Sequence, residues 1–316
     1  MDSVLSRLAS APILGLLALL GWAYYLMPQF ARRAWGASFG ILLRLLGLRA
    51  PVVWQNLQLA YPDSMPGAEA SRKSLYRASY SHLARIILEV TMLFGPMQRY
   101  ATRRAILRGN ENWKAAKARG KGVIFLASHV GNWEVMAATG ALQGGIDIIL
   151  VTKHLKPEWL HRAIERRRLR CNVRATYEPR TLRDVLRHLK DNGTVGFVLD
   201  QYAGPPVGVR VPVFGVPVGT TTAIAMIAKR TGAAVLPVVN YRTPDSRWVV
   251  QIRPALEWTA HEDAHVELAI NTARFAEEIE RDIRAHPEQW LWIHRRFKGD
   301  LSPLRPDEWA HGRIRT

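Results

Sequence analysis

Residues 120–135 read GKGVIFLASHVGNWEV, and this stretch decides the fold. Its centre, residues 123–127 (VIFLA), is a short continuous apolar run. Such runs are typical of strands buried on both faces, as in parallel sheets. Gly131 permits a turn after the strand, and Asn132 is a good N-cap for a helix over residues 132–142. The stretch therefore predicts one strand, turn and helix unit of an α/β fold.

The same alternation continues along the chain. Further apolar runs that predict strands cover residues 146–151, 195–199 and 234–239, and helical patterns cover residues 69–94, 157–169, 182–189, 221–230 and 265–285. Tyr241-Arg242 and residues 248–252 flank a Pro-Asp-Ser turn, which predicts a hairpin at a sheet edge. The pattern predicts an α/β domain whose mainly parallel mixed sheet is flanked by helices.

The first part of the chain predicts a membrane anchor. Residues 8–31 carry no charge, and a bilayer core needs ~20 apolar residues. Arg7 and Asp2 precede this window, whereas Arg32, Arg33, Arg44 and Arg49 follow it. The positive-inside bias then places the rest of the chain in the cytoplasm. We expect a single-pass anchor over residues 1–32 and a catalytic domain over residues 33–316; a buried core helix is the alternative.

Charge and cysteine content narrow the function classes. The net charge of +18 favours an anionic partner, which nucleic acid, anionic lipid or an acidic protein would each satisfy. Nucleic acid is not expected, because the chain has no helix-turn-helix and no aromatic-basic repeat. Cys171 is the one cysteine, so there is no internal disulfide. No cluster has zinc-ligand spacing, and no metal or cofactor is expected.

His129 and Glu134 are candidate catalytic residues. On one continuous helix a spacing of five residues separates two side chains by ~140°, so they meet only if His129 lies in the turn and Glu134 in the first helical turn. A neutral imidazole there can remove a hydroxyl proton while a carboxylate orients it. The spacing alone is a weak signal, and a structural histidine satisfies it as well. Ser128 adjoins His129 and no nucleophile elbow is present, which disfavours a serine hydrolase.

The surroundings of this pair resemble the late lipid A acyltransferase family, the lauroyl and myristoyl transferases of lipopolysaccharide assembly. The resemblance is collinear over nearly the whole chain. It rests on residues 56–63 (NLQLAYPD), 120–135, 155–160 (LKPEWL) with an arginine-rich helix after it, 200–201 (DQ), 211–238 and 286–298 (HPEQWLWIHRRFK).

The resemblance implies roles for particular residues. His129 would be the general base and Glu134 its orienting partner. Arg168 is expected to bind or polarise the site, although Arg166, Arg167 and Arg170 crowd it. The residues implied to bind substrate are Gly131, Asn132, Lys153, Arg168, Asp200, Gln201 and Arg295. Lys153 stands where the family commonly has arginine, and Val213-Phe214-Gly215 where it usually has Phe-Phe-Gly.

The implied activity is transfer of a fatty acyl chain, without an acyl-enzyme, from acyl carrier protein or coenzyme A to a hydroxyl of a lipid A precursor at the inner membrane. The expected acceptor is a phosphorylated, acylated disaccharide whose 3-hydroxyacyl chain attacks. A mannosylated phosphatidylinositol, another glycolipid and a lysophospholipid are alternative acceptors. A basic peripheral membrane protein is the alternative without catalysis.

Overall fold

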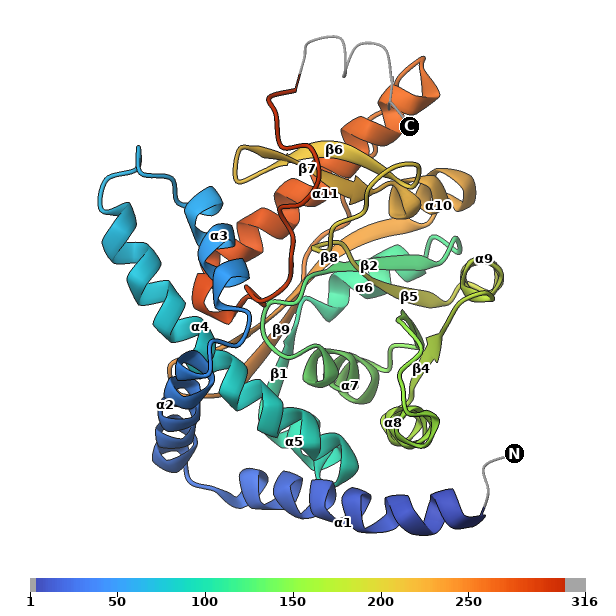
Figure 1. The fold of residues 1–316 in the computed structure, drawn as a ribbon. Coiled ribbons are helices and arrows are strands. Elements are labelled where there is room, and N and C mark those ends of the chain that lie inside the picture. Colours follow the sequence, from blue (N-terminus) through green and yellow to red (C-terminus); the bar gives the residue numbers. More distant parts are fainter. Residues whose placement is uncertain (1–3, 305–316) are drawn as a thin grey trace.

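The computed structural model describes residues 4–304, with side chains from residue 10 onward. Residues 1–3, including Asp2, and residues 305–316 lie outside this description, as does the side chain of Arg7. The described chain forms a sheet with helices on both faces, as the sequence predicts (Figure 1).

The strands are β1 (Ala105–Arg108), β2 (Val123–Ala127), β3 (Ile148–Val151), β4 (Val173–Thr176), β5 (Thr194–Val198), β6 (Gly208–Val213), β7 (Val216–Thr221), β8 (Ala234–Arg242) and β9 (Trp248–Ile252). Seven of them form the main sheet in the order β1-β9-β8-β2-β5-β3-β4. Neighbouring strands run parallel except β8 and β9, which are antiparallel. Strands β6 and β7 form a separate antiparallel pair.

The α-helices are α1 (Val4–Leu26), α2 (Gln29–Leu45), α3 (Ala50–Ala60), α4 (Ala68–Thr91), α5 (Met97–Arg103), α6 (Asn110–Lys117), α7 (Trp133–Gly144), α8 (Glu158–Arg170), α9 (Thr181–Lys190), α10 (Ala223–Thr231) and α11 (Ala264–Ala285). Two short 3₁₀ helices, η1 (Met92–Phe94) and η2 (Pro287–Gln289), follow α4 and α11.

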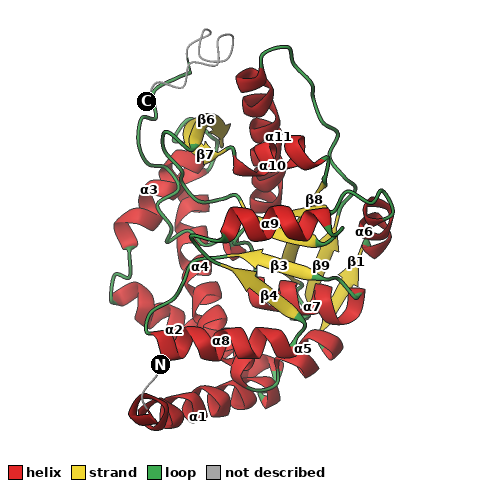
Figure 2. Cartoon of the chain, turned by 90° about the vertical axis from the view of Figure 1, so that its right-hand side faces the viewer, coloured by secondary structure: helices red, strands yellow, loops and turns green. Residues whose placement is uncertain are grey.

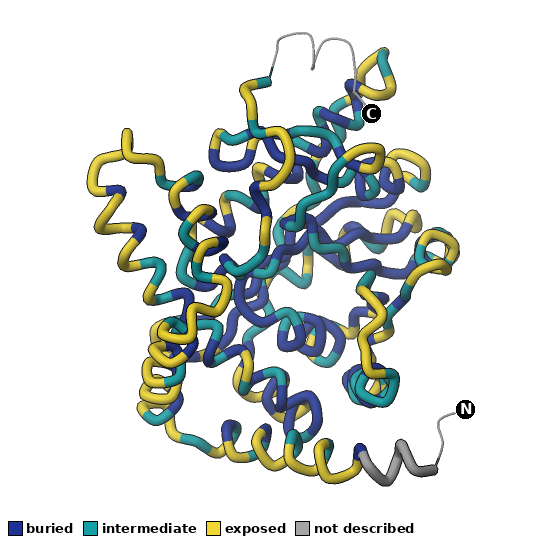
Figure 3. The backbone as a smooth tube through the Cα atoms, in the orientation of Figure 1, coloured by how far each residue is buried: buried dark blue, intermediate teal, exposed yellow. Residues whose placement is uncertain are grey.

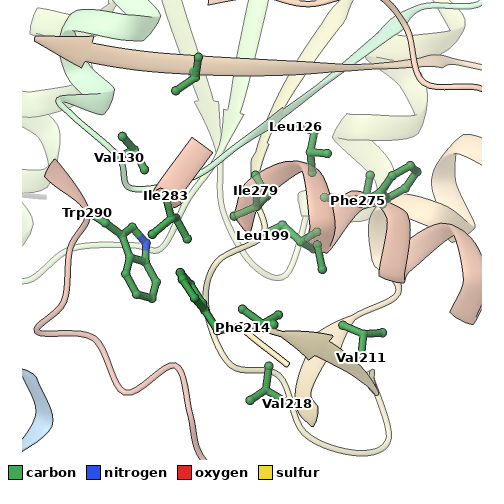
Figure 4. Packing of buried hydrophobic residues seen from close by; sticks show 14 of the residues in the cluster. Leu126, Val130, Leu199, Val211, Phe214, Val218, Phe275, Ile279, Ile283 and Trp290 are labelled. Carbon is green, nitrogen blue, oxygen red and sulfur yellow. The ribbon is translucent and has the colours of Figure 1, made fainter. Parts of the chain in front are cut away.

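Helices cover both faces of the sheet (Figure 2). Because successive side chains of a strand point to opposite faces, Ile124 and Leu126 of β2 pack with α9, α10 and α11, whereas Val123 and Phe125 pack with α5 and α7. Figure 4 shows the first of these two cores, where Leu126 lies near Phe275 and Ile279 of α11. Burial on both faces explains why β2 is apolar at every position.

Several predicted elements are confirmed, and two details are corrected. β2 has the predicted bounds, and the Asn132 side chain caps α7 by accepting hydrogen bonds from the Glu134 and Val135 amides. The predicted hairpin forms between β8 and β9, but it is not at the sheet edge because β1 pairs with β9. Pro157 is the N-cap of α8 and does not lie in its first turn.

The predicted anchor window is divided between two helices. α1 ends at Leu26 and α2 begins at Gln29, after Pro28. Tyr24 of α1 is buried in the domain, where its hydroxyl donates to Glu89. Among residues 4–304, no single helix is long and apolar enough to cross a membrane, although α2 and α3 together pass that test as a pair bent by 103°.

Two glycines set the approach of α2 to α4. A Cβ at Gly40 would lie 2.7 Å from the Ser81 Cα, and one at Gly36 would lie 2.6 Å from the Arg85 Cγ. The two helices therefore touch along a Gly-x-x-x-Gly face, and the opposite side of α2 stays exposed (Figure 3).

Candidate active site

The site begins at the carboxyl ends of two neighbouring strands. β2 and β5 are parallel, with Ala127 opposite Val198. Two residues further along each chain stand His129 and Asp200, so the same register brings them together. The Asp200 carboxylate accepts one hydrogen bond from the His129 amide at 2.7 Å, and it lies 2.8 Å from Nδ1 of the ring. This end of a parallel strand is where open α/β sheets bind ligands.

Asp200 sets the protonation and the direction of the imidazole. Trp290 Nε1 donates a third hydrogen bond to this buried carboxylate at 2.8 Å. Burial opposes ionisation, but His129 and these donors outweigh it and lower the pKa of Asp200 to about 2. Burial also lowers the pKa of His129, and the charge and hydrogen bond of Asp200 outweigh that effect and raise it above its ordinary value. A neutral ring that donates from Nδ1 to Asp200 keeps the Nε2 lone pair for a proton.

Glu134 has a different neighbour from the one the sequence predicts. Its two carboxylate oxygens accept from Nε and Nη2 of Arg168 at 3.0 and 2.5 Å, and both side chains are buried. The orienting contact that was predicted for Glu134 is made by Asp200. The physical reason is direction: Glu134 lies in the first turn of α7 and points to α8, whereas Asp200 ends the strand beside His129. The choice of Arg168 among the arginines of α8 agrees with this bidentate contact.

Gly131 and Asn132 shape the turn behind the histidine. Gly131 has φ +74°, and a Cβ there would lie 2.1 Å from the Asn240 carbonyl oxygen. Asn132 is fully buried, caps α7 and donates to Glu89 at 3.2 Å. Both residues position the backbone around His129, and the buried Asn132 side chain is already bonded within the protein.

The other predicted binding residues are spread around the site. Lys153 and Arg295 are exposed, and Gln201 is half-buried. Arg296, beside Arg295, is instead buried and donates to the Gln201 carbonyl, the Gly219 carbonyl and the Thr220 hydroxyl. Burial lowers the pKa of Arg296 to about 10. Arg296 is therefore bonded within the protein and is not a solvated surface charge.

An apolar cavity of about 120 Å³ opens beside His129. It runs between α7 and the sheet, from His129, Trp133 and Arg168 to Ile146 and Ile252. Gly140 of α7 and Gly196 of β5 line it. A Cβ at Gly140 would make only ordinary contact, at 3.5 Å from Ile146, whereas one at Gly196 would lie 3.0 Å from Leu150. A cavity with this lining suits a hydrocarbon chain whose reactive end reaches the imidazole.

Segments far apart in the sequence meet at this site. Asn56 of α3 donates to the carbonyls of Trp292 and His294 at 2.7 Å each. Val130, next to His129, forms a β-bridge with Trp290 (Figure 4). Sequence analysis did not identify the contact between Trp290 and Asp200, because the two residues are 90 positions apart in the chain and no local pattern links them.

Other nucleophile and metal chemistry has little support in the described residues. Burial raises the pKa of the Cys171 thiol to about 11, so little thiolate forms near neutral pH. Within residues 4–304, no group of three or more His, Cys, Asp or Glu side chains is placed to hold a metal ion.

Comparison with known proteins decides the family. The sequence profile for the bacterial lipid A biosynthesis acyltransferases matches residues 6–299. The chain belongs to this family. It is similar to the lipid A biosynthesis lauroyltransferase of Escherichia coli, at 27% identity over 281 residues and 88% of each chain. The lipid A biosynthesis palmitoleoyltransferase of Escherichia coli is also 27% identical, over 282 residues and 88% of each chain.

A second group of relatives acts on a different lipid. The phosphatidylinositol mannoside acyltransferase of Mycobacterium tuberculosis is 29% identical over 209 residues, which is 63% of this chain and 62% of the relative. This acyltransferase is therefore an enzyme of acyl-group transfer within a family of lipid A and glycolipid acyltransferases.

Proposed function

We propose that the acyltransferase moves a fatty acyl chain from an acyl thioester, on acyl carrier protein or coenzyme A, to a hydroxyl of a lipid A precursor. His129 Nε2 takes the hydroxyl proton as the oxygen attacks the thioester carbonyl. The tetrahedral intermediate then collapses, the C–S bond breaks, and the proton passes from His129 to the leaving thiolate. The products are the new ester and the free thiol, and the imidazole is neutral again.

The observation that carries this proposal is the place of His129. It lies between a buried carboxylate, which holds Nδ1 at 2.8 Å, and an apolar cavity suited to an acyl chain. A base at the mouth of a hydrocarbon cavity favours attack on a carbonyl at the head of a bound chain.

Glu134 and Arg168 are proposed to act together. Arg168 lines the same cavity as His129, and Glu134 holds its guanidinium by two hydrogen bonds. A guanidinium held in this way can stabilise the negative charge that develops on the carbonyl oxygen during attack. Glu134 is then a positioning residue, and it acts through Arg168.

We place the enzyme at the cytoplasmic face of the inner membrane, with the first part of the chain as its anchor, because this location suits a lipid acceptor. Leu19, Leu26, Phe30 and Leu45 of α1 and α2 are exposed apolar side chains. Exposed apolar residues gathered on neighbouring helices favour contact with lipid.

The acceptor is tested by supplying the purified enzyme with acyl carrier donor and each acceptor separately. We expect an additional acyl chain on a phosphorylated, acylated glucosamine disaccharide, read by mass spectrometry. The mycobacterial relative supports a mannosylated phosphatidylinositol as the second candidate. Acylation of that lipid alone would overturn the choice of acceptor and keep the chemistry.

His129→Ala is expected to lower turnover by about 10²–10⁴-fold, because a positioned base contributes about that much. His265→Ala, an exposed residue of α11, is the matched control and should keep normal turnover. Near-normal turnover of His129→Ala, with an unchanged circular dichroism spectrum, would rule out His129 as the base.

Direct transfer is tested by mixing the enzyme with donor alone. Intact-protein mass spectrometry should show no stoichiometric acyl adduct, because the cysteine is buried and its pKa is raised. A trapped acyl-enzyme would contradict direct transfer.

A further inference from the structure

A basic groove lies outside the site described above. It has a volume of about 600 Å³ and is formed by α2, α4, the β8–β9 turn and η2. Three arginines line it: Arg33 of α2, Arg85 of α4 and Arg242 of β8. His82 and Gln289 line this groove and also a narrow cavity that reaches His129. The groove and the narrow cavity beside His129 therefore share these two lining residues.

The arginines of the groove carry more charge than their neighbours balance. Arg242 pairs with the buried Glu89 at 2.6 Å, and Glu89 also accepts from Tyr24 and Asn132. Neither Arg33 nor Arg85 has a carboxylate within salt-bridge distance among the described residues. Arg85 donates to the Ser246 hydroxyl at 3.4 Å, and Arg33 donates to the Pro244 carbonyl. Glu288, at the rim, accepts from Gln289.

Buried donors in the groove lack partners. Nε of Arg85 and Nε of Arg242 are buried without a hydrogen-bond partner in the described chain. Arg242 is 8% exposed. An unpaired buried donor costs free energy, so these groups favour a ligand that accepts several hydrogen bonds at once.

Repulsion between the cations points to the charge of that ligand. Burial, then the nearby Arg242, lower the pKa of Arg85, and burial with Arg242 and Arg85 lower that of His82. An anion between the two guanidinium groups would relieve this repulsion. Planar guanidinium donors fit phosphate oxygens best.

We propose that this groove binds a phosphate group of a lipid headgroup at the membrane surface. The surroundings fit such a ligand, because α2 lines the groove with Arg33 and also carries the exposed apolar residues Phe30 and Leu45. The proposal rests on the proposed function in taking the acceptor glycolipid as the source of the phosphate. A bulk anionic phospholipid has the same chemistry, and the experiment separates the two.

The test compares Arg33→Gln, Arg85→Gln and the double variant with Arg77→Gln. Arg77 is exposed on α4 and outside the groove, so it makes the same charge change elsewhere. Arg33 is exposed, and its side chain bonds only to a backbone carbonyl among the described contacts. Arg33→Gln is therefore expected to fold, so the test does not depend on the stability of Arg85→Gln.

Full-length protein is titrated with neutral phosphatidylcholine vesicles that contain a phosphorylated acylated disaccharide, its dephosphorylated form, or phosphatidylglycerol. We expect each groove variant to bind the phosphorylated disaccharide about tenfold more weakly, as for one lost charge-assisted contact, with no change for the dephosphorylated form. An equal loss on phosphatidylglycerol would overturn the acceptor as source and assign the groove to bulk lipid.

Binding equal to that of Arg77→Gln on every vesicle would overturn the groove as a phosphate site. Failure of the proposed function has a different signature, because vesicle binding is read without acyl transfer. If the enzyme acylates no lipid A precursor but its groove variants still bind the phosphorylated disaccharide more weakly, the proposed acceptor is refuted and the phosphate site is not.

Discussion

Asp200 is the direct hydrogen-bonding partner of His129. It holds the ring through Nδ1 and raises the pKa of the imidazole above its ordinary value. Since only the neutral ring accepts a proton, kcat/KM of the wild-type enzyme should fall as pH drops through that raised pKa.

Asp200→Asn should lower kcat/KM and shift this acid limb to lower pH. The reason is that the carboxylate charge that favours protonated His129 is removed while burial of the ring remains. Asp191→Asn serves as control, because it removes the same negative charge at an exposed position. An acid limb that stays in place in Asp200→Asn would mean that another group sets the pKa.

Glu134→Gln should act differently. It leaves Arg168 buried without its carboxylate, and breaking such a pair costs about 3–5 kcal/mol. We expect a lower thermal midpoint and lower turnover, while the acid limb stays at the wild-type pH because Asp200 is intact. Exposed Glu277→Gln is the control. An acid limb that moves as in Asp200→Asn would restore Glu134 as the partner of the histidine.

At the level of elements, the strands that the sequence predicted are the ones buried on both faces. β2 is apolar throughout and was predicted with its correct bounds, whereas the edge strand β4 is buried only at its two end residues. β6 and β7 were missed because Pro212 and Pro217 interrupt them; the two prolines face each other across the pair. Short edge strands and strands that contain proline lack the continuous apolar run by which a buried strand is recognised in a sequence.

The same limit of local sequence patterns explains which residues of the candidate site could be predicted. His129 was identified because strand, turn and cap are encoded in adjacent residues. Its partner could not be chosen locally, since Asp200 comes from the neighbouring strand and only the sheet order brings the two together. Asp200 was predicted among the substrate-binding residues, and its contact with the ring follows only from the pairing register of β2 and β5.

Helix α7, with Gly140, lines the cavity that we propose holds the acyl chain. A Cβ at Gly140 would make ordinary contact with Ile146 at 3.5 Å, so a side chain is tolerated there and fills the cavity. Gly140→Leu should reduce kcat/KM for long-chain donors by about tenfold or more and spare short-chain donors. Gly140→Ala is the smaller control. Equal losses on all chain lengths would show that the acyl chain lies elsewhere.

For the whole molecule, the net charge of +18 affects encounter with acidic partners. Association with acyl carrier protein or anionic vesicles should weaken steadily with salt, since screening shortens from ~10 Å at 0.1 M to ~3 Å at 1 M. Stopped-flow or cosedimentation across that range measures it, with neutral vesicles as control. An affinity that is flat across the range would exclude electrostatic steering.

The contact between Trp290 and Asp200 also has a consequence for the timing of synthesis. The indole that holds the carboxylate, and the carbonyls that Asn56 binds, come from the last part of the described chain. A chain still on the ribosome can assemble its sheet from residues already translated, but its histidine lacks this support. The support of Asp200 is therefore expected to form only after residues 290–294 have been translated and have packed beside the sheet.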